Sequence, residues 1–231
     1  MARLLITDGA HPLSEELADQ LRAAGHEVYI APKPAAAPED VIGWLDRFGV
    51  PDGLIVSTYD PVRESLDGGD ADILAGAVLG GIEQTYLALK HVGTAMADRG
   101  GGRVIFLSSI FADKPTGSAP SYSITHGALQ MMMKELALLY GHWGLTVNTI
   151  KLAPAEAEDP TFDSELVQAA YDIPSKVPTG LRVTARDAAG AIEYFMSDAA
   201  RNVNGADLRI DGGLLYHYMD RTFDRAKGGD A

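Results

Sequence analysis

Residues 3–31 read RLLITDGAHPLSEELADQLRAAGHEVYIA. RLLIT at 3–7 is a short apolar run typical of a buried strand, DGAHP forms a turn, and LSEELADQLRAAG is an amphipathic helix closed by Gly25. HEVYIA at 26–31 is a second apolar run. The segment therefore predicts a strand, a turn, a helix and another strand, which is the repeating unit of a parallel α/β sheet.

The same alternation continues along the rest of the chain. We expect strands at 53–57, 103–109, 145–152 and 207–211, and helices over 39–48, 70–98, 121–141 and 186–197. Because the strands are apolar throughout, rather than at every second position, both faces of the sheet must be covered. The predicted fold class is α/β, with a Rossmann-like doubly wound parallel sheet, helices on both faces, and a single domain spanning 1–231.

Composition excludes several function classes. A net charge of −13 without a visible basic patch argues against a nucleic-acid surface. The absence of cysteine excludes disulfides, cysteine-ligated zinc and a thiol nucleophile, and no spacing of histidines and carboxylates suggests a metal site. No apolar run has the length of a membrane span and the N-terminus lacks a signal-peptide pattern, so we expect a cytoplasmic protein.

Three polar residues stand where the predicted sheet would bind a ligand. Ser109 ends the strand at 103–109, Tyr122 opens the helix at 121–141, and His126 lies one helical turn further on the same face. The carboxyl ends of parallel strands open into one crevice, so Ser109 and Tyr122 can converge there on a substrate oxygen. We expect these three residues to be catalytic, with Tyr122 as general acid or base. The alternative for His126 is a place on the helix surface or in an interface.

With these residues in view, the chain resembles the short-chain dehydrogenase/reductase superfamily over nearly its whole length. The resemblance rests on the spacing of Ser109 and Tyr122, together with RGGGRVIFLSS, LTVNTIKLAP and NGADLRIDGG. It implies a Rossmann-type fold and an active site of serine, tyrosine and lysine. It also implies a homodimer or homotetramer in which the helices at 70–98 and 121–141 form the subunit contact.

The segment TDGAHPLS at 7–14 departs from the phosphate-binding loop that this resemblance implies. Thr7 is retained, but Asp8, Pro12 and Ser14 stand at the three glycine positions. Those glycines let the backbone approach a pyrophosphate, whereas a proline removes an amide and a carboxylate adds repulsion. We expect an ordinary turn in which Ser14 caps the next helix, with a reshaped pocket for a small ligand or anion as the alternative.

Two further departures concern the cofactor. The chain is too short between HEVYIA and GLIVS to hold the helix and strand that would wall the adenine pocket, so the fold is shortened on that side. His126 stands where the resemblance implies the lysine that holds the nicotinamide ribose and lowers the pKa of the tyrosine. A histidine is mostly neutral at pH 7 and would act more weakly and in a pH-dependent way. We therefore expect no bound cofactor.

Within the superfamily, the chain resembles the branch of halohydrin dehalogenases, which keep serine and tyrosine and use no cofactor. The similarity lies in VSTYD at 56–60 and in VPTGLRVTARDA at 177–188. That branch implies an arginine at the position of His126, so the chain departs from it there.

The substrate side of the site is expected on segments that follow strands. Tyr59 and Pro154 each come after a predicted strand, and we expect them to line the substrate pocket. Residues 153–182 show no clear periodicity and are expected to form a substrate lid, while residues 216–231 form a C-terminal tail.

Three functions fit the sequence. The first is cofactor-independent acid/base chemistry through Tyr122 and Ser109, such as elimination, isomerisation or a halohydrin/epoxide reaction on a small oxygen-bearing molecule. The second is an NAD(P)-dependent oxidoreductase acting on an alcohol or carbonyl, with Lys33 available for a 2′-phosphate. The third is a non-catalytic binding or partner subunit. The retained hydroxyl pair beside the altered loop favours the first, and a nucleotide-binding measurement would separate the three.

Overall fold

The computed structural model describes residues 1–9, 11, 13–58, 69–115, 119–153 and 177–216. The strands are β1 (Arg3–Ile6), β2 (Glu27–Ile30), β3 (Gly53–Ser57), β4 (Gly102–Ser109), β5 (Leu145–Leu152) and β6 (Asp207–Ile210). The α-helices are α1 (Ser14–Ala23), α2 (Pro38–Phe48), α3 (Ala71–Ala88), α4 (Thr94–Asp98), α5 (Pro120–Gly141) and α8 (Ala185–Met196). Shorter turns are η1 (Leu89–Gly93), η2 (Ile110–Ala112), η3 (Asp198–Ala200) and η4 (Leu214–Tyr216).

The six strands of the described residues form one parallel sheet with the order β2-β1-β3-β4-β5-β6. β3 and β5 are buried along their whole length, and β4 is buried from Val104 onward, which explains why their sequences are apolar on both faces. Ser109 lies in register with Leu152, so β4 and β5 end together. The predicted α/β parallel sheet is confirmed.

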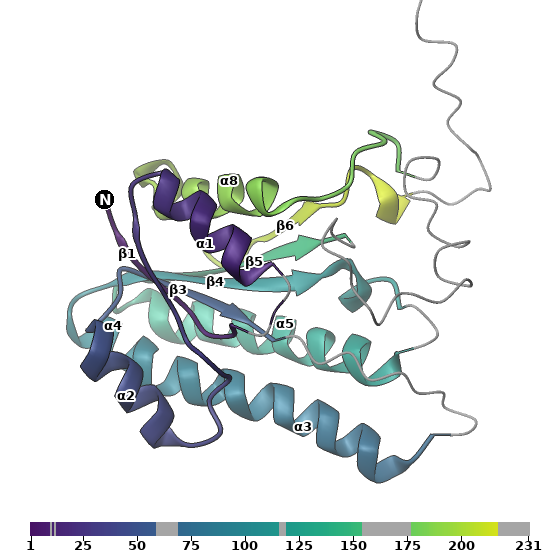
Figure 1. Cartoon of the computed structure of the whole chain (residues 1–231), viewed down its shortest axis with the longest axis horizontal. Helices are drawn as coiled ribbons and strands as arrows, with labels where there is room; N and C mark the ends of the chain where they lie inside the picture. The colour runs from purple at the N-terminus through teal and green to yellow at the C-terminus, as the bar shows by residue number, and fades with distance from the viewer. Residues whose placement is uncertain (10, 12, 59–68, 116–118, 154–176, 217–231) are drawn as a thin grey trace, which may run out of the picture.

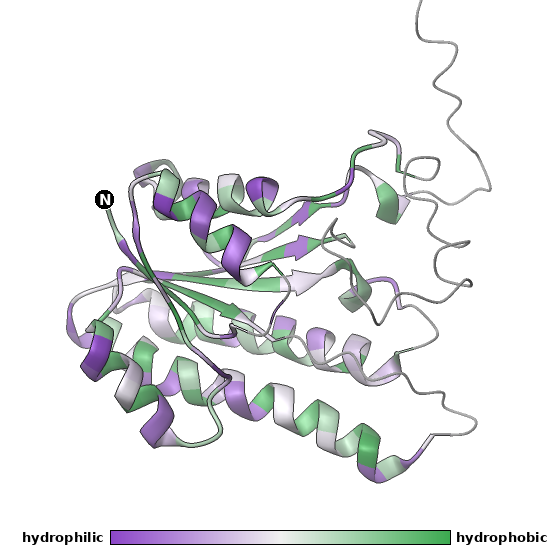
Figure 2. Ribbon diagram, in the orientation of Figure 1, coloured by the Kyte–Doolittle hydropathy of each residue, from purple (hydrophilic) through white to green (hydrophobic). Residues whose placement is uncertain are grey.

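Helices cover both faces of this sheet (Figure 1). On one face α1 and α8 pack against the sheet through a hydrophobic cluster that contains Leu17 of α1, Ile105 of β4 and Phe195 of α8. On the other face α2, α3, α4 and α5 lie over a second cluster that contains Phe106 and Leu129. Figure 2 shows hydrophobic residues concentrated in the central strands, between helical layers that carry many hydrophilic residues. No helix in the described ranges is both long and apolar enough to cross a membrane.

The sheet is short on the side of β2, as the sequence predicts. β2 forms one edge, and α2 leads directly from it to β3, which pairs with the opposite side of β1. No further helix and strand follow β2 before the chain crosses.

The long helix expected over 70–98 is interrupted by a π-helical turn. η1 separates α3 from α4 at Leu89–Gly93. The hydroxyl of Tyr140 donates to the Leu89 carbonyl at 3.1 Å, and a Cβ at Gly93 would lie 3.1 Å from the same hydroxyl. The wide turn is therefore stabilised by a side chain from α5, which apolar periodicity alone does not reveal.

Candidate functional site

Ser109 lies at the C-terminal end of β4 and is buried. Its Oγ accepts a hydrogen bond of 3.2 Å from the Phe111 backbone N–H, which caps the η2 turn. Because the oxygen accepts this bond, the hydroxyl hydrogen of Ser109 is available to donate to another oxygen. Ser109 is thus held in place, and none of the hydrogen bonds described uses its hydroxyl hydrogen.

Tyr122 lies in the first turn of α5, two residues after Pro120 begins the helix. It is almost fully buried, with 9% of its surface exposed. Its ring meets the Phe111 ring edge-on at 6.4 Å and lies 4.3 Å from the His126 ring. Phe111, in the η2 turn that follows Ser109, therefore contacts Tyr122. Ser109, Tyr122 and His126 thus form one buried group.

His126 is buried in this group, with 2% of its surface exposed, so the alternative of a surface histidine is wrong. Its Nδ1 lies 3.1 Å from the Oγ of Ser108, and its ring stacks on Phe106 at 5.8 Å. Its Nε2 is buried and has no hydrogen-bond partner among the described residues. Such an atom is costly to leave unpaired and suits a ligand hydroxyl or carbonyl.

Burial lowers the pKa of His126 to about 3, with a smaller contribution from the charge of His11. The imidazole is therefore neutral from mildly acidic to alkaline pH. The predicted pH-dependent tuning of Tyr122 by His126 near neutrality is accordingly wrong. What His126 keeps is a fixed ring that can hydrogen-bond.

The loop between β1 and α1 is tied to the protein through its own polar groups. Thr7 Oγ1 donates to the Ser57 carbonyl at 3.3 Å and accepts from the Ser57 N–H at 3.2 Å. Asp8 is fully buried, and Ser14 Oγ donates to the Asp8 carbonyl at 2.5 Å. The predicted capping by Ser14 is wrong, because Leu13 is the N-cap residue and Ser14 is already helical.

The segment after β2 carries Lys33, the residue considered for a 2′-phosphate. Its Nζ lies 3.1 Å from Asp40 Oδ1. The pKa of Asp40 is lowered, first by a hydrogen bond from the Ala36 backbone N–H and then by Lys33. Lys33 is largely exposed and has Asp40 as a neighbour, and its role toward a nucleotide stays a prediction.

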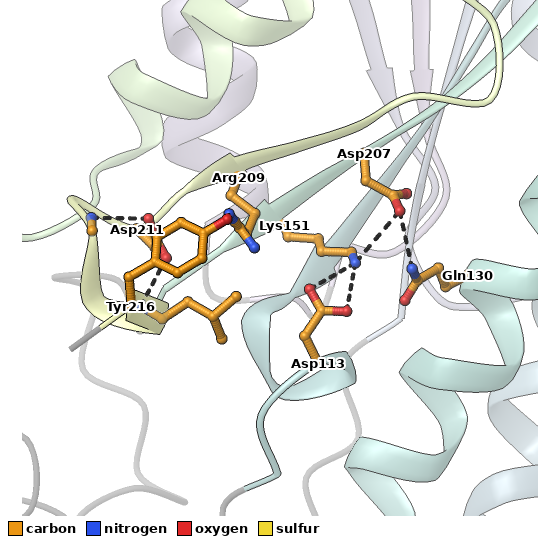
Figure 3. Close-up of a pocket in the computed structure, with 9 residues that line it drawn as sticks. Asp113, Gln130, Lys151, Asp207, Arg209, Asp211 and Tyr216 are labelled. Atoms are coloured by element: carbon orange, nitrogen blue, oxygen red, sulfur yellow. Dashed lines mark hydrogen bonds and ion pairs between the residues drawn. The ribbon is translucent and has the colours of Figure 1, made fainter. Parts of the chain in front are cut away.

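A charged cluster beside the serine turn was not anticipated from the sequence (Figure 3). Lys151 on β5 is buried and its Nζ meets both carboxylate oxygens of Asp113 at 2.8 Å. Asp207 on β6 lies 3.6 Å away on its other side and accepts a hydrogen bond from Gln130 of α5. Because Asp113 directly follows η2, Lys151 anchors the turn that begins at Ser109. The sequence feature that could have indicated this cluster is Lys151 itself, a charged residue within the predicted buried strand LTVNTIKL.

Other predicted site residues lie outside the described residues. These are Pro12, Tyr59 and Pro154, with most of the predicted lid at 153–182 and all of the tail beyond Tyr216. Their proposed places in a substrate pocket stay predictions. Within the described ranges, no group of three or more histidine, cysteine or carboxylate side chains could hold a metal ion.

The sequence matches known proteins over the region that carries this site. A family model described as Enoyl-(Acyl carrier protein) reductase matches residues 81–215. Cis-4-hydroxycyclohexanecarboxylate dehydrogenase from Sinomonas cyclohexanicum is 27% identical over 225 residues, 92% of this chain and 89% of that protein. L-rhamnose 1-dehydrogenase (NAD(P)(+)) from Azotobacter vinelandii is 30% identical over 131 residues, 56% of this chain and 51% of that protein. The match to the second relative thus spans about half its length.

The fold also matches solved structures. A short chain dehydrogenase from Leptospira borgpetersenii serovar Hardjo-bovis, crystallised with bound NAD+, has a TM-score of 0.79 and 19% sequence identity over 92% of each chain. At this level of identity the match speaks for the fold alone.

These comparisons contradict the expectation that the chain uses no cofactor. The relatives are dehydrogenases, one of them named for NAD(P)+, and a protein of the same fold was crystallised with NAD+. The expectation gave too much weight to the loop at 7–14, which would contact only the phosphate part of such a ligand. Ser109 and Tyr122 are retained and buried, with His126 beside Tyr122. A lyase or isomerase reaction is likewise not supported.

Proposed function

Because the chain belongs to the short-chain dehydrogenase/reductase superfamily, we propose that it is an NAD(P)-linked oxidoreductase that interconverts an alcohol and a carbonyl on a small molecule. The observation that carries this proposal is the buried group at the ends of β4 and α5. There, Ser109 has a hydroxyl hydrogen to donate and Tyr122 lies against His126, whose Nε2 lacks a partner among the described residues.

The residues of this group suit one end of a nicotinamide cofactor. The buried Nε2 of His126 would pair with a ribose hydroxyl, at the position where the superfamily resemblance implies a lysine. The loop end suits the cofactor less well, since Asp8 places a buried carboxylate where a diphosphate would be expected. When bound, the nicotinamide ring supplies or accepts the hydride.

Each side chain then has a distinct task on the substrate oxygen. In carbonyl reduction, the phenol of Tyr122 gives its proton to the substrate oxygen and becomes a phenolate, and in alcohol oxidation that phenolate takes the hydroxyl proton and becomes a phenol again. Ser109 donates its hydroxyl hydrogen to the same oxygen and holds the substrate in place. His126 cannot store the proton near neutral pH, because burial keeps its pKa at about 3.

The test is a nucleotide-linked assay on the purified chain. NADH and NADPH consumption would be followed with a panel of small ketones and aldehydes, and the reverse reaction with alcohols. We expect turnover with at least one nucleotide. A chain that converts these substrates without any nucleotide, or that binds neither nucleotide at millimolar concentration, would contradict the proposal.

A homodimer is part of the same proposal, and the apolar outer surface of α3 and α5 supports it. Large apolar side chains are exposed there, namely Ile73, Leu79 and Tyr86 of α3 and Met131, Leu138 and Leu139 of α5. An exposed apolar surface of this kind on two neighbouring helices favours contact with a second copy. The pairing of such dimers into a tetramer and the cytoplasmic location remain predictions.

A further inference from the structure

The strand order divides the crevice unequally. Sheets that bind dinucleotides are typically built from two mononucleotide-binding halves, with strand order 3-2-1-4-5-6 and the ligand laid across the switch point between strands 1 and 4. Here the order is β2-β1-β3-β4-β5-β6. Among the described residues, only β1 and β2 lie on one side of the switch point, and four strands lie on the other. The half that would receive the adenosine part of a dinucleotide is therefore one strand short.

The segment that follows β2, from Ala31 to Ala35, packs against the loop between β1 and α1 on the side where the adenosine would lie. The Gly9 N–H donates to the Ala31 carbonyl at 3.1 Å, and a Cβ at Gly9 would lie 2.8 Å from that same oxygen. Ala31 and Ala35 are both buried. A crevice lined in part by Thr7, Ala35 and Ser57 has no room for a water molecule. The Gly9 amide, which a phosphate would need, is thus already bonded to the Ala31 carbonyl, and the crevice at Thr7 and Ser57 is too small to admit even a water molecule.

The charges around the start of α1 oppose a diphosphate. Asp8 is a buried carboxylate just before the helix, and Glu15 and Glu16 are exposed in its first turn. The loop at 7–14 contains no lysine or arginine, the Nδ1 of its His11 accepts a hydrogen bond from the Leu13 N–H, and Lys33 of the next segment is paired with Asp40. The partial positive charge of the helix N-terminus is therefore offset by the protein's own carboxylates, where a phosphate-binding helix would keep it for the ligand.

The other end of the crevice shows the opposite pattern. Nε2 of His126 is buried and unpaired among the described residues, while Nδ1 is held by Ser108 at 3.1 Å. Tyr122 lies against the same ring, and Ser109 keeps a hydroxyl hydrogen to donate. His126 Nε2, unpaired among the described residues, and the hydroxyl hydrogen of Ser109 thus both lie at the β4–α5 end of the crevice.

We propose, on the premise of the nicotinamide-linked reaction above, that this chain recognises its cofactor through the nicotinamide riboside end alone, and that the diphosphate and adenosine add no net affinity. The ligand class is a nicotinamide riboside, free or as part of a larger nucleotide. On this proposal, the shortened sheet and the acidic loop border a site that binds the nicotinamide riboside and makes no favourable contact with the diphosphate or the adenosine.

Three probes separate the parts of the cofactor in a titration of the full chain. We expect NADH and dihydronicotinamide riboside to bind with dissociation constants within about threefold of each other, and ADP-ribose not to displace either. NADH binding more than about thirtyfold tighter than the riboside, or displacement by ADP-ribose, would overturn the inference while leaving the proposed function standing. Binding by none of NADH, NADPH and the riboside would overturn both.

Charge variants test the acidic loop without touching the buried group. Replacing both exposed carboxylates in Glu15→Gln/Glu16→Gln should tighten NADH binding by about threefold and leave riboside binding unchanged. Added salt should tighten NADH binding to the unmodified chain, because screening weakens the repulsion. Glu39→Gln, in the first turn of α2, is the matched control and should change neither ligand. A local repulsion would be contradicted if the double variant bound NADH and the riboside more tightly by the same factor. It would also be contradicted if Glu39→Gln tightened NADH binding as much as the double variant does.

Discussion

The hydroxyls of Ser109 and Tyr122 differ in their surroundings, and variants should show the difference. Tyr122→Phe removes the group that exchanges a proton with the substrate, and we expect kcat to fall by about a hundredfold or more. Ser109→Ala removes a hydrogen bond that strengthens as charge develops on the oxygen, and we expect a loss of about tenfold to a hundredfold. Steady-state kinetics with nucleotide would measure both.

The matched control for the tyrosine is Tyr194→Phe, since Tyr194 is half-exposed on α8. It should leave kcat unchanged. Full activity in Tyr122→Phe would remove Tyr122 from the reaction.

The buried His126 predicts a loss of stability in acid. Its pKa is about 3 in the folded protein and near 6.5 when unfolded, so below pH 6.5 the unfolded chain binds a proton that the folded chain does not. The contribution of this group is therefore constant above about pH 7 and falls as the pH drops toward 3. Between pH 7 and pH 5, we expect a loss of about 2 kcal/mol in the free energy of unfolding from this residue.

Urea unfolding at a series of pH values measures this loss. His126→Gln should show a shallower decline between pH 7 and pH 5 than the unmodified chain, whatever its stability at pH 7. His142→Gln, which alters an exposed histidine just after α5, should keep the original slope. Equal slopes in all three proteins would show that His126 titrates normally.

At the scale of elements, the pair of Lys151 and Asp113 joins the η2 turn to β5. Asp113→Ala leaves the buried ammonium with Asp207 at 3.6 Å as its remaining ion-pair partner. We expect a loss of about 2 kcal/mol, less than for a fully buried pair because Asp113 is partly exposed. The double variant Asp113→Ala/Lys151→Met should recover about 1 kcal/mol of this, since it also removes the stranded charge.

Chemical denaturation of the two variants measures that recovery. Asp19→Ala breaks the exposed pair with Arg22 and should cost less than about 0.5 kcal/mol, which sets the scale for a surface interaction. A double variant no more stable than Asp113→Ala would mean that the two residues are not energetically coupled.

The elements differ in how far their sequences determine them. The strands and the main helices were predictable because each is set by local apolar periodicity and by turn residues such as Gly25, which has a φ of 95°. The π turn depends on Tyr140, 51 positions from the carbonyl it binds, and the Lys151 anchor joins residues 38 positions apart. Contacts at such separations leave no local pattern in the sequence.

For the molecule as a whole, assembly depends on the apolar surface shared by α3 and α5. Leu138→Glu places a charge on a leucine that is 79% exposed, and we expect the dimer to weaken by at least about tenfold. Analytical ultracentrifugation over a range of concentrations would measure the change. Leu181→Glu, which alters a leucine with 68% exposure outside both helices, should leave assembly unchanged. A chain that is monomeric before any substitution would remove the basis for this proposal.

The sequence predicts where the site residues lie in the fold, but it does not predict their burial or their charge states. The spacing of Ser109 and Tyr122 reflects the fold, because strand ends and the following helix meet at one crevice. The burial of His126 and its contact with Ser108 depend on packing against Phe106, which the spacing does not encode. The altered loop at 7–14 suggested that the cofactor was absent, but this loop would contact only the phosphate part of the cofactor.

The shortened sheet also has a colloidal consequence. β2 and β6 are its two edges, and unpaired edges can recruit strands from other molecules. Each is only four residues long, and β2 is followed by Pro32 and Pro34, which lack the N–H that pairing requires. Glu27, Asp207 and Arg209 add charge to these borders. Within the part of the chain that the structure describes, both edges of the sheet are thus short and charged, which disfavours edge-to-edge pairing between copies.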